Sequence, residues 1–241
     1  MRGINRVDCG VYSDKMRLRK LLTQQCQVSY TALFSQPAFA LWGDGKVILE
    51  GLFSTFGKRG ISLASFRFGQ GSQDQANQSV TVTFNPSWFY RFQLDRVEST
   101  LDNFTAEELK VFPEVLEEGA NWLRAVVPHF GFQSHLFTYS GHHKLSEGTS
   151  RQVLEPLSAV TMPGVGVSEG NGIILHWEVP DQKWRLQLTV DHSLAVANGL
   201  FTHFILFVNE PVIDYVRTAE AGRAALQKAL NNIGLEFDDA T

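Results

Sequence analysis

Two alternating segments joined by a short turn constrain the fold of this chain most strongly. Ile173–Val179 and Trp184–Val190 each place an apolar side chain at every second position, the period of a half-buried β-strand. Pro180–Lys183 between them has the composition of a turn. Folding about this turn sets Glu178 opposite Arg185, a charge pair that stabilises strand pairing by about 0.2–1 kcal/mol. The sequence therefore predicts an antiparallel hairpin, with these apolar pairs: Val179 with Trp184, Trp177 with Leu186, Leu175 with Leu188, and Ile173 with Val190.

Two long helices and further strands complete the predicted fold. Thr105–Glu108 is a capping box, and an apolar stripe at steps of three and four follows it as far as Pro128. A second stripe follows Asn209, a preferred N-cap, with Pro211 in its first turn, and ends at Gly234. Runs of strands followed by a helix predict an α+β fold, with antiparallel sheet covered by two long helices. The other predicted strands are 29–41 and 46–53 (a hairpin about Gly43-Asp44-Gly45), 61–68, 79–84, 88–94, 132–139 and 200–208.

The two halves of the chain repeat this order of elements. The pattern F-x-x-F-x-L occurs at Phe89–Leu94, before the first helix, and again at Phe201–Leu206, before the second. We therefore expect a tandem duplication, with residues 1–131 and 132–241 as two closely packed strands-then-helix halves of one domain or two. Chance similarity is the alternative, because the chain contains 18 phenylalanines.

Charge and hydropathy limit the expected partners and location. A net charge of −4 argues against attraction of the whole chain to nucleic acid, which is therefore an unexpected partner. The basic run Lys15–Lys20 is either a local phosphate contact or a solvated basic face. No segment approaches the 18 or so apolar residues that cross a bilayer, and the N-terminus lacks a signal peptide's apolar stretch. We expect a soluble, cytoplasmic protein without membrane contact, in which Cys9 and Cys26 are free thiols.

Histidines are the main candidates for chemistry. His142 and His143 are adjacent, so on a strand they would point to opposite faces and could not share a metal ion. The run Asp191-His192-Ser193 has the residue types of a hydrolytic triad, but three consecutive residues do not provide its geometry. We expect no catalytic residues, no metal and no cofactor. The alternative is an enzyme in which a histidine and a carboxylate from neighbouring strands form a pair.

An aromatic segment supplies the main candidate binding surface. Alternation places Trp88, Tyr90 and Phe92 on one face of a strand, and Phe89 and Arg91 on the other. The favoured function is a non-catalytic binding or assembly protein whose aromatic-rich sheet forms an apolar ligand pocket or a protein-contact surface. The expected partner is a protein or a small apolar ligand, with a homo-oligomer as a further possibility. The predicted binding residues are Trp88, Tyr90, Phe92, His142, His143 and His192.

Overall fold

The structure is a computed structural model that describes residues 18–42, 45–69, 78–127, 129–157 and 171–238. Its strands are β1 (Arg19–Phe34), β2 (Phe66–Gly69), β3 (Ser79–Asn85), β4 (Trp88–Gln93), β5 (Arg96–Asp102), β6 (Phe132–Leu145), β7 (Ile173–Val179), β8 (Trp184–His192), β9 (Leu200–Val208) and β10 (Leu235–Phe237). Its α-helices are α1 (Phe39–Trp42), α2 (Gly45–Phe56), α3 (Ala106–Val126), α4 (Ser150–Leu154) and α5 (Tyr215–Asn232). Short 3₁₀ turns occupy Gly57–Arg59, Leu63–Ser65, Glu155–Leu157 and Pro180–Gln182.

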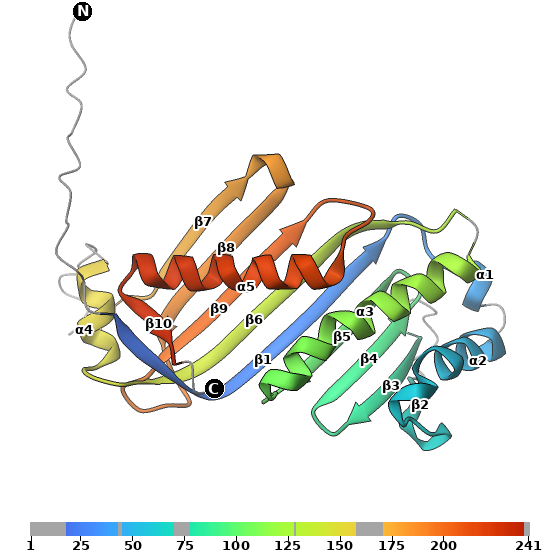
Figure 1. Ribbon diagram of the computed structural model, residues 1–241, viewed down its shortest axis with the longest axis horizontal. Helices are drawn as coiled ribbons and strands as arrows, with labels where there is room; N and C mark the ends of the chain where they lie inside the picture. Colours follow the sequence, from blue (N-terminus) through green and yellow to red (C-terminus); the bar gives the residue numbers. More distant parts are fainter. Residues whose placement is uncertain (1–17, 43–44, 70–77, 128, 158–170, 239–241) are drawn as a thin grey trace, which may run out of the picture.

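One ten-stranded sheet joins both halves of the chain, which confirms a mixed fold with a large antiparallel sheet. The strand order is β2-β3-β4-β5-β1-β6-β9-β8-β7, and β10 pairs with β1 off this path. The pairing of β1 with β10 is parallel, whereas all the other pairings are antiparallel. The two longest strands, β1 and β6, lie side by side at the centre (Figure 1).

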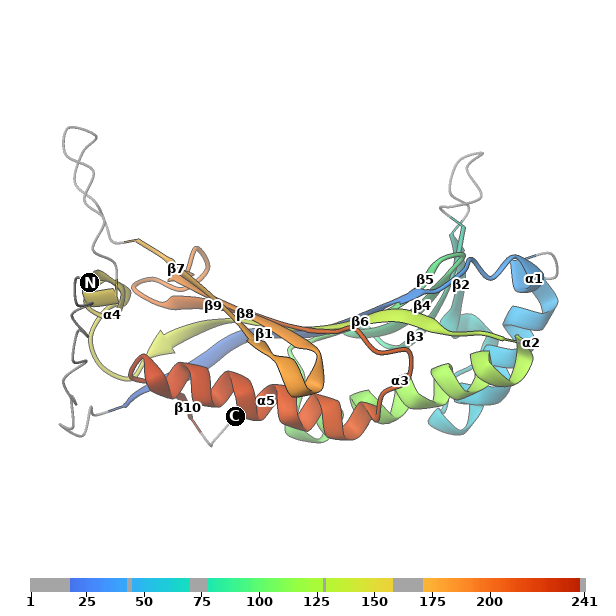
Figure 2. The same ribbon diagram turned by 90° about the horizontal axis from the view of Figure 1, so that it is seen from above.

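The two faces of this sheet differ. Helices α2, α3 and α5 lie on one face, and both ends of the sheet rise away from them (Figure 2). The opposite face is therefore concave, and no helix among the described residues lies across it. We call this concave surface the open face. It consists of the side chains of β1 to β9 that point away from α2, α3 and α5.

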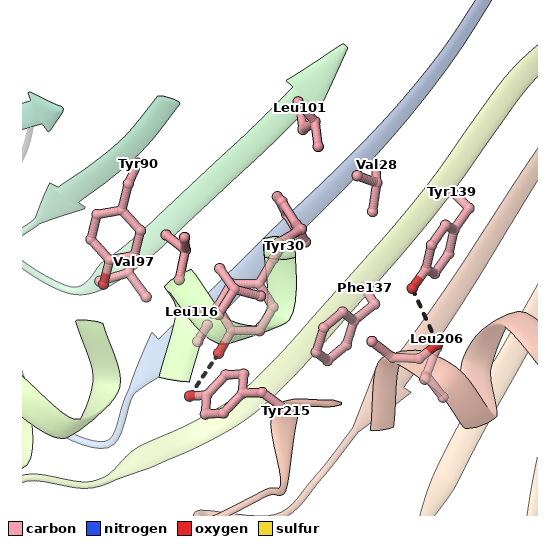
Figure 3. Packing of buried hydrophobic residues seen from close by; sticks show 14 of the residues in the cluster. Val28, Tyr30, Tyr90, Val97, Leu101, Leu116, Phe137, Tyr139, Leu206 and Tyr215 are labelled. Carbon is pink, nitrogen blue, oxygen red and sulfur yellow. Dashed lines mark hydrogen bonds between the residues drawn. The ribbon is translucent and has the colours of Figure 1, made fainter. Parts of the chain in front are cut away.

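The core lies between the sheet and the helices. Along β9 every second residue is buried, from Leu200 to Val208, and the residues between are half-buried on the open face. Tyr30 joins the helix layer to the sheet: its hydroxyl lies 2.7 Å from His135 Nδ1 and donates to Tyr215 Oη at 3.2 Å (Figure 3). All three of these side chains are buried, and the bonds between them satisfy polar groups that burial would otherwise make costly.

The strand hairpin at residues 173–190 is confirmed, whereas the hairpin about Asp44 is wrong. Every predicted pair between β7 and β8 is present, and Arg185 Nε lies 3.3 Å from Glu178 Oε1. The predicted strand 46–53 falls instead in helix α2. Its buried residues Ile48, Leu52 and Phe56 follow at steps of four, which is helical spacing.

The ends of the two long helices follow from local capping. The predicted capping box of α3 is confirmed: Thr105 Oγ1 accepts from Glu108 N at 3.2 Å, and Glu108 Oε2 accepts from Thr105 N at 2.9 Å. Helix α5 begins later than predicted, because Asp214 rather than Asn209 is its N-cap, accepting from Arg217 N at 2.9 Å. In the described part of the chain, no helix combines the length and the apolar character needed to cross a membrane.

Close packing of α3 on β4 leads to a first stability test. A Cβ atom added at Gly119 would lie 2.6 Å from Tyr90 Oη, and Tyr90 is only 1% exposed. We expect Gly119→Ala to lower the free energy of unfolding by about 1–3 kcal/mol, because overpacking outweighs the gain of about 1 kcal/mol in helix propensity.

The paired variant Tyr90→Phe is expected to be nearly neutral alone, because its hydroxyl has no hydrogen-bond partner among the described residues. It also removes the atom nearest to the added methyl group, so the double variant should lose less stability than the sum of the two single variants. Urea unfolding measures all four proteins. A Gly119→Ala variant as stable as the parent would show that this contact is not tight.

Candidate functional site

Strand pairing brings residues from distant segments into one row across the open face. The pairings of β8-β9-β6-β1-β5-β4-β3-β2 align eight residues side by side. In order, these are Arg185, Phe207, Leu136, Thr31, Glu98, Arg91, Thr81 and Arg67. Nothing in the local sequence around Arg67 points to a site. Only the pairing of β2 with β3 brings it into line with Arg91.

A groove of about 890 Å³ crosses the end of this row, over β2, β3 and β4. It contains the guanidinium groups of Arg67 and Arg91 and the ring of Phe89, and its described lining includes no aspartate or glutamate. We call it the arginine groove. Its remaining polar lining consists of Ser65, Ser79, Thr81, Thr83 and Asn85. This combination of cations, hydroxyl groups and an aromatic ring is suited to an anionic ligand.

Arg91 is held in the groove by neighbours on three sides. Its Cζ atom lies 4.9 Å from the centre of the Phe89 ring, and its Nε donates to Thr81 Oγ1 at 3.4 Å. Its third contact, at 3.4 Å, is with Glu98, which also accepts from Arg96 Nε at 2.9 Å. Arg67 lies in the same lining and forms no ion pair with the residues that the structure describes.

The aromatic residues that the sequence assigns to a binding surface lie in the core. Trp88, Tyr90 and Phe92 are 7%, 1% and 0% exposed, because this face of β4 points towards the helices (Figure 3 shows Tyr90). The other face of the strand, with Phe89 and Arg91, points into the arginine groove, and Trp88, at the start of β4, also contributes to the groove's lining. Alternation separates the two faces in the sequence, but it does not reveal which one a helix covers.

His142 and His143 lie on opposite faces of β6. His143 is 2% exposed, with Nδ1 at 3.1 Å from Thr23 Oγ1 and Nε2 at 2.9 Å from Thr202 Oγ1. Burial, helped by the charge of His142, lowers the pKa of His143 to about 4, so it is neutral at pH 7. His142 is on the open face, where its Nδ1 lies 2.9 Å from Ser193 Oγ. The two imidazoles have separate surroundings and separate roles.

His192 and Ser193 form hydrogen bonds with the start of a helix and with a turn. His192 Nδ1 lies 2.8 Å from Ser150 Oγ at the start of α4, while Ser193 Oγ accepts from the backbone N–H groups of Ala195 and Val196. Asp191 accepts from the backbone N–H of His192, and among the described residues no imidazole ring makes a hydrogen bond to a carboxylate side chain, so the predicted histidine–carboxylate pair is not formed. The same residues include no group of three or more side chains able to hold a metal ion.

The basic run 15–20 lies partly outside the described residues. Of its cations, Arg19 and Lys20 are described, and Lys20 Nζ lies 2.9 Å from Asp238 Oδ1. Lys20 sits in β1 beside β10, far along the strand from the arginine groove. The described part of this run is therefore not in the lining of the arginine groove. Cys9 also lies outside the described residues, and Cys26 is a free thiol whose pKa is raised by burial.

Comparison with known proteins returned a structural match. No family model and no curated protein matches the sequence. Among solved structures, the chain is similar to a rolling circle replication initiator protein from Geobacillus stearothermophilus. The TM-score is 0.33 and the sequence identity 10%, and the match covers 87% of this chain and 80% of that chain. A likeness at this level assigns no function to this chain. The geometry of the open face is the evidence for its function.

The predicted function and partners need correction. A non-catalytic protein that holds an apolar ligand or a protein partner on its aromatic sheet, with nucleic acid an unexpected partner, is the wrong description. The aromatic face that was to form the pocket is buried beneath helices. The overall charge of −4 is a poor guide to local partners, because the described lining of the arginine groove has two arginines and no carboxylate.

Proposed function

We propose that the open face binds nucleic acid and that the arginine groove holds its sugar-phosphate backbone. The observation that carries this proposal is the groove itself: two arginines, a row of hydroxyls and the half-buried ring of Phe89, without a carboxylate in its described lining. A guanidinium group matches the geometry of a phosphate, and hydroxyl groups are common phosphate contacts. Arg91 over the Phe89 ring adds an aromatic surface on which a base can stack.

The size and shape of the sheet support the same function. Strands are about 4.8 Å apart, so the row from Arg185 to Arg67 spans roughly 34 Å before curvature. A concave surface of this length can follow several nucleotides, and exposed sheets are an established way to bind nucleic acid. Because the whole chain is acidic, attraction must come from the local field of the groove and should weaken steeply with salt.

The first test removes the charge of the groove. We expect Arg67→Ala with Arg91→Ala to weaken binding of all oligonucleotides alike, since phosphate contacts carry no sequence information. The slope of log affinity against log salt should fall by about 2, one for each lost contact. Fluorescence anisotropy with labelled oligonucleotides of about 20 nucleotides measures both quantities.

A matched control removes two cations from the helix side. Arg217→Ala with Lys228→Ala takes the same charge from exposed positions of α5, so it should leave affinity and salt slope close to those of the parent. The proposal is wrong if the parent protein binds no oligonucleotide at low salt. It is equally wrong if the α5 variant loses binding and the groove variant keeps it.

We also infer that the chain is a tandem duplication of residues 1–131 and 132–241, with α3 and α5 as the two long helices that cover the sheet. The strand order supports this: β1 and β6 are central, β5 and β9 flank them, and β4 and β8 follow. In each half, the strand that flanks the central one, β5 or β9, is the strand that precedes the long helix. A crystal structure tests the inference. Superposition of β1–α3 on β6–α5 with matching strand direction would support it, and mismatched directions would contradict it.

A further inference from the structure

A second hollow, of about 330 Å³, opens at the end of β5 on the other side of the sheet's centre. It lies where β1, β6 and β9 continue beyond the last residue of β5. Its lining comes from four strands and the turn after β5. The side chains that matter here are Gln25, Gln27, Asp102, Asn103, His142 and Phe201.

The polar groups of this hollow offer both donors and acceptors. Gln27 Nε2 donates to Asp102 Oδ1 at 2.7 Å, which fixes the carboxylate and leaves its other oxygen able to accept. Asn103 Oδ1 accepts from Cys26 N at 3.2 Å, so its NH₂ group remains a donor. Gln25 makes no hydrogen bond through its amide to any described residue. Amide and carboxylate groups placed together in this way match the edge of a nucleobase.

One wall of the hollow is aromatic. The rings of His142 and Phe201 are 4.9 Å apart, and Phe201 stacks on His203 at 6.1 Å with an angle of 16° between the planes. These rings come from β6 and β9 and lie on the open face, level with the amide groups of β1. A flat ring beside hydrogen-bonding groups is the usual arrangement for stacking and reading a single-stranded base.

The backbone of β1 is also accessible at this point. Strand β5 pairs with β1 from Gln27 onwards, and β10 pairs with Arg19–Leu21. Residues 22–25 therefore have β6 as their one strand neighbour in the described part of the chain. A bulge between Thr23 and Gln25 lies in the same stretch. Bulges of this kind redirect side chains and are common next to functional sites.

We propose that this hollow binds one base of a single-stranded nucleic acid and prefers a base with an exocyclic amino group. The inference rests on the proposed function. Asp102 can accept a hydrogen bond from the amino group of cytosine or adenine, which thymine lacks. In a duplex the same base edge is already paired, so single strands are the ligand. Arg91 and Gln27 are two strands and four residues apart, about 17 Å, so one strand can occupy groove and hollow together.

The test compares binding of dC, dA and dT oligonucleotides, an oligonucleotide without bases, and a duplex, each of about 20 nucleotides. We expect the parent protein to bind dC and dA about tenfold more tightly than dT. Asp102→Asn should bring that ratio close to one without weakening dT binding, because it removes a negative charge but keeps the shape. Phe201→Ala should weaken every base-bearing single strand by about tenfold and leave the oligonucleotide without bases unchanged.

Glu178→Gln is the matched control, because it removes a carboxylate from β7, at the far edge of the same face. Glu178→Gln should keep the parent protein's ratio of dC affinity to dT affinity. Equal affinity for dC, dT and the oligonucleotide without bases, or tighter binding of the duplex, would overturn the base pocket while groove-dependent binding could persist. Loss of binding in the Arg67 and Arg91 variants with an unchanged dC-to-dT ratio in Asp102→Asn would also overturn it. No binding of any oligonucleotide to the parent protein would overturn both proposals.

Discussion

Phe137→Ala is expected to lower the free energy of unfolding by about 3–5 kcal/mol, because it leaves a cavity where the two halves of the sheet meet. Phe137 is 0% exposed on the central strand β6, and its ring lies 4.9 Å from the ring of Tyr30 on β1 (Figure 3). The contacts of this ring join helix-side residues of both halves. Denaturation in urea, followed by circular dichroism, measures the loss.

The neighbouring residue provides the control for this variant. Leu136 precedes Phe137 in β6 but points to the open face, where it is half-buried. Leu136→Ala should therefore cost about 1 kcal/mol, well below the value for Phe137. Equal losses for the two variants would mean that the open face is packed like a core, which would contradict an accessible concave surface.

Acid is expected to destabilise the fold between pH 6.5 and 4 through two buried histidines. Burial, aided by Arg124, lowers the pKa of His135 to about 4, and burial lowers that of His143 to about 4 as well. In this window the unfolded chain takes up protons that the folded chain excludes. The stability that these two histidines contribute is therefore fully present above pH 6.5. It falls as the pH decreases towards 4 and does not change further below pH 4. With 1.36 kcal/mol per pKa unit, each histidine accounts for roughly 3 kcal/mol.

Substitution separates these histidines from the carboxylates, which also titrate in acid. His143→Gln keeps an amide able to bond with Thr23 and Thr202, and it should remove the part of the pH dependence that corresponds to one proton. Unfolding curves at several pH values provide the data. A His143→Gln protein with the full dependence of the parent would rule out this role for His143.

The sequence predicts correctly those elements whose position is specified by side chains within the same short segment. In the hairpin of β7 and β8, the apolar residues specify one face, and Glu178 opposite Arg185 specifies the register from the other face. Helix α3 is predicted in the same way, because its capping box marks its start. These signals are short-range, so a single segment contains all of them.

The incorrect predictions involve choices that depend on the rest of the chain. The hairpin about Asp44 relied on a turn dipeptide, although Ile48, Leu52 and Phe56 were already spaced for a helix. At β4, the sequence separates Phe89 and Arg91 from the buried aromatics, but only the position of α3 decides which face stays open. The arginine groove is still less visible, because strand pairing brings Arg67 and Arg91 together from separate strands.

Photo-crosslinking of a labelled single-stranded oligonucleotide, followed by mass spectrometry, tests most directly whether the open face binds nucleic acid. Crosslinks are expected in the peptides that contain Phe89 and Arg91, and at Phe201, all on the concave side of the sheet. They should disappear in the Arg67→Ala, Arg91→Ala variant and persist in the Arg217→Ala, Lys228→Ala variant. Crosslinks confined to α2, α3 or α5, on the opposite side, would contradict the account.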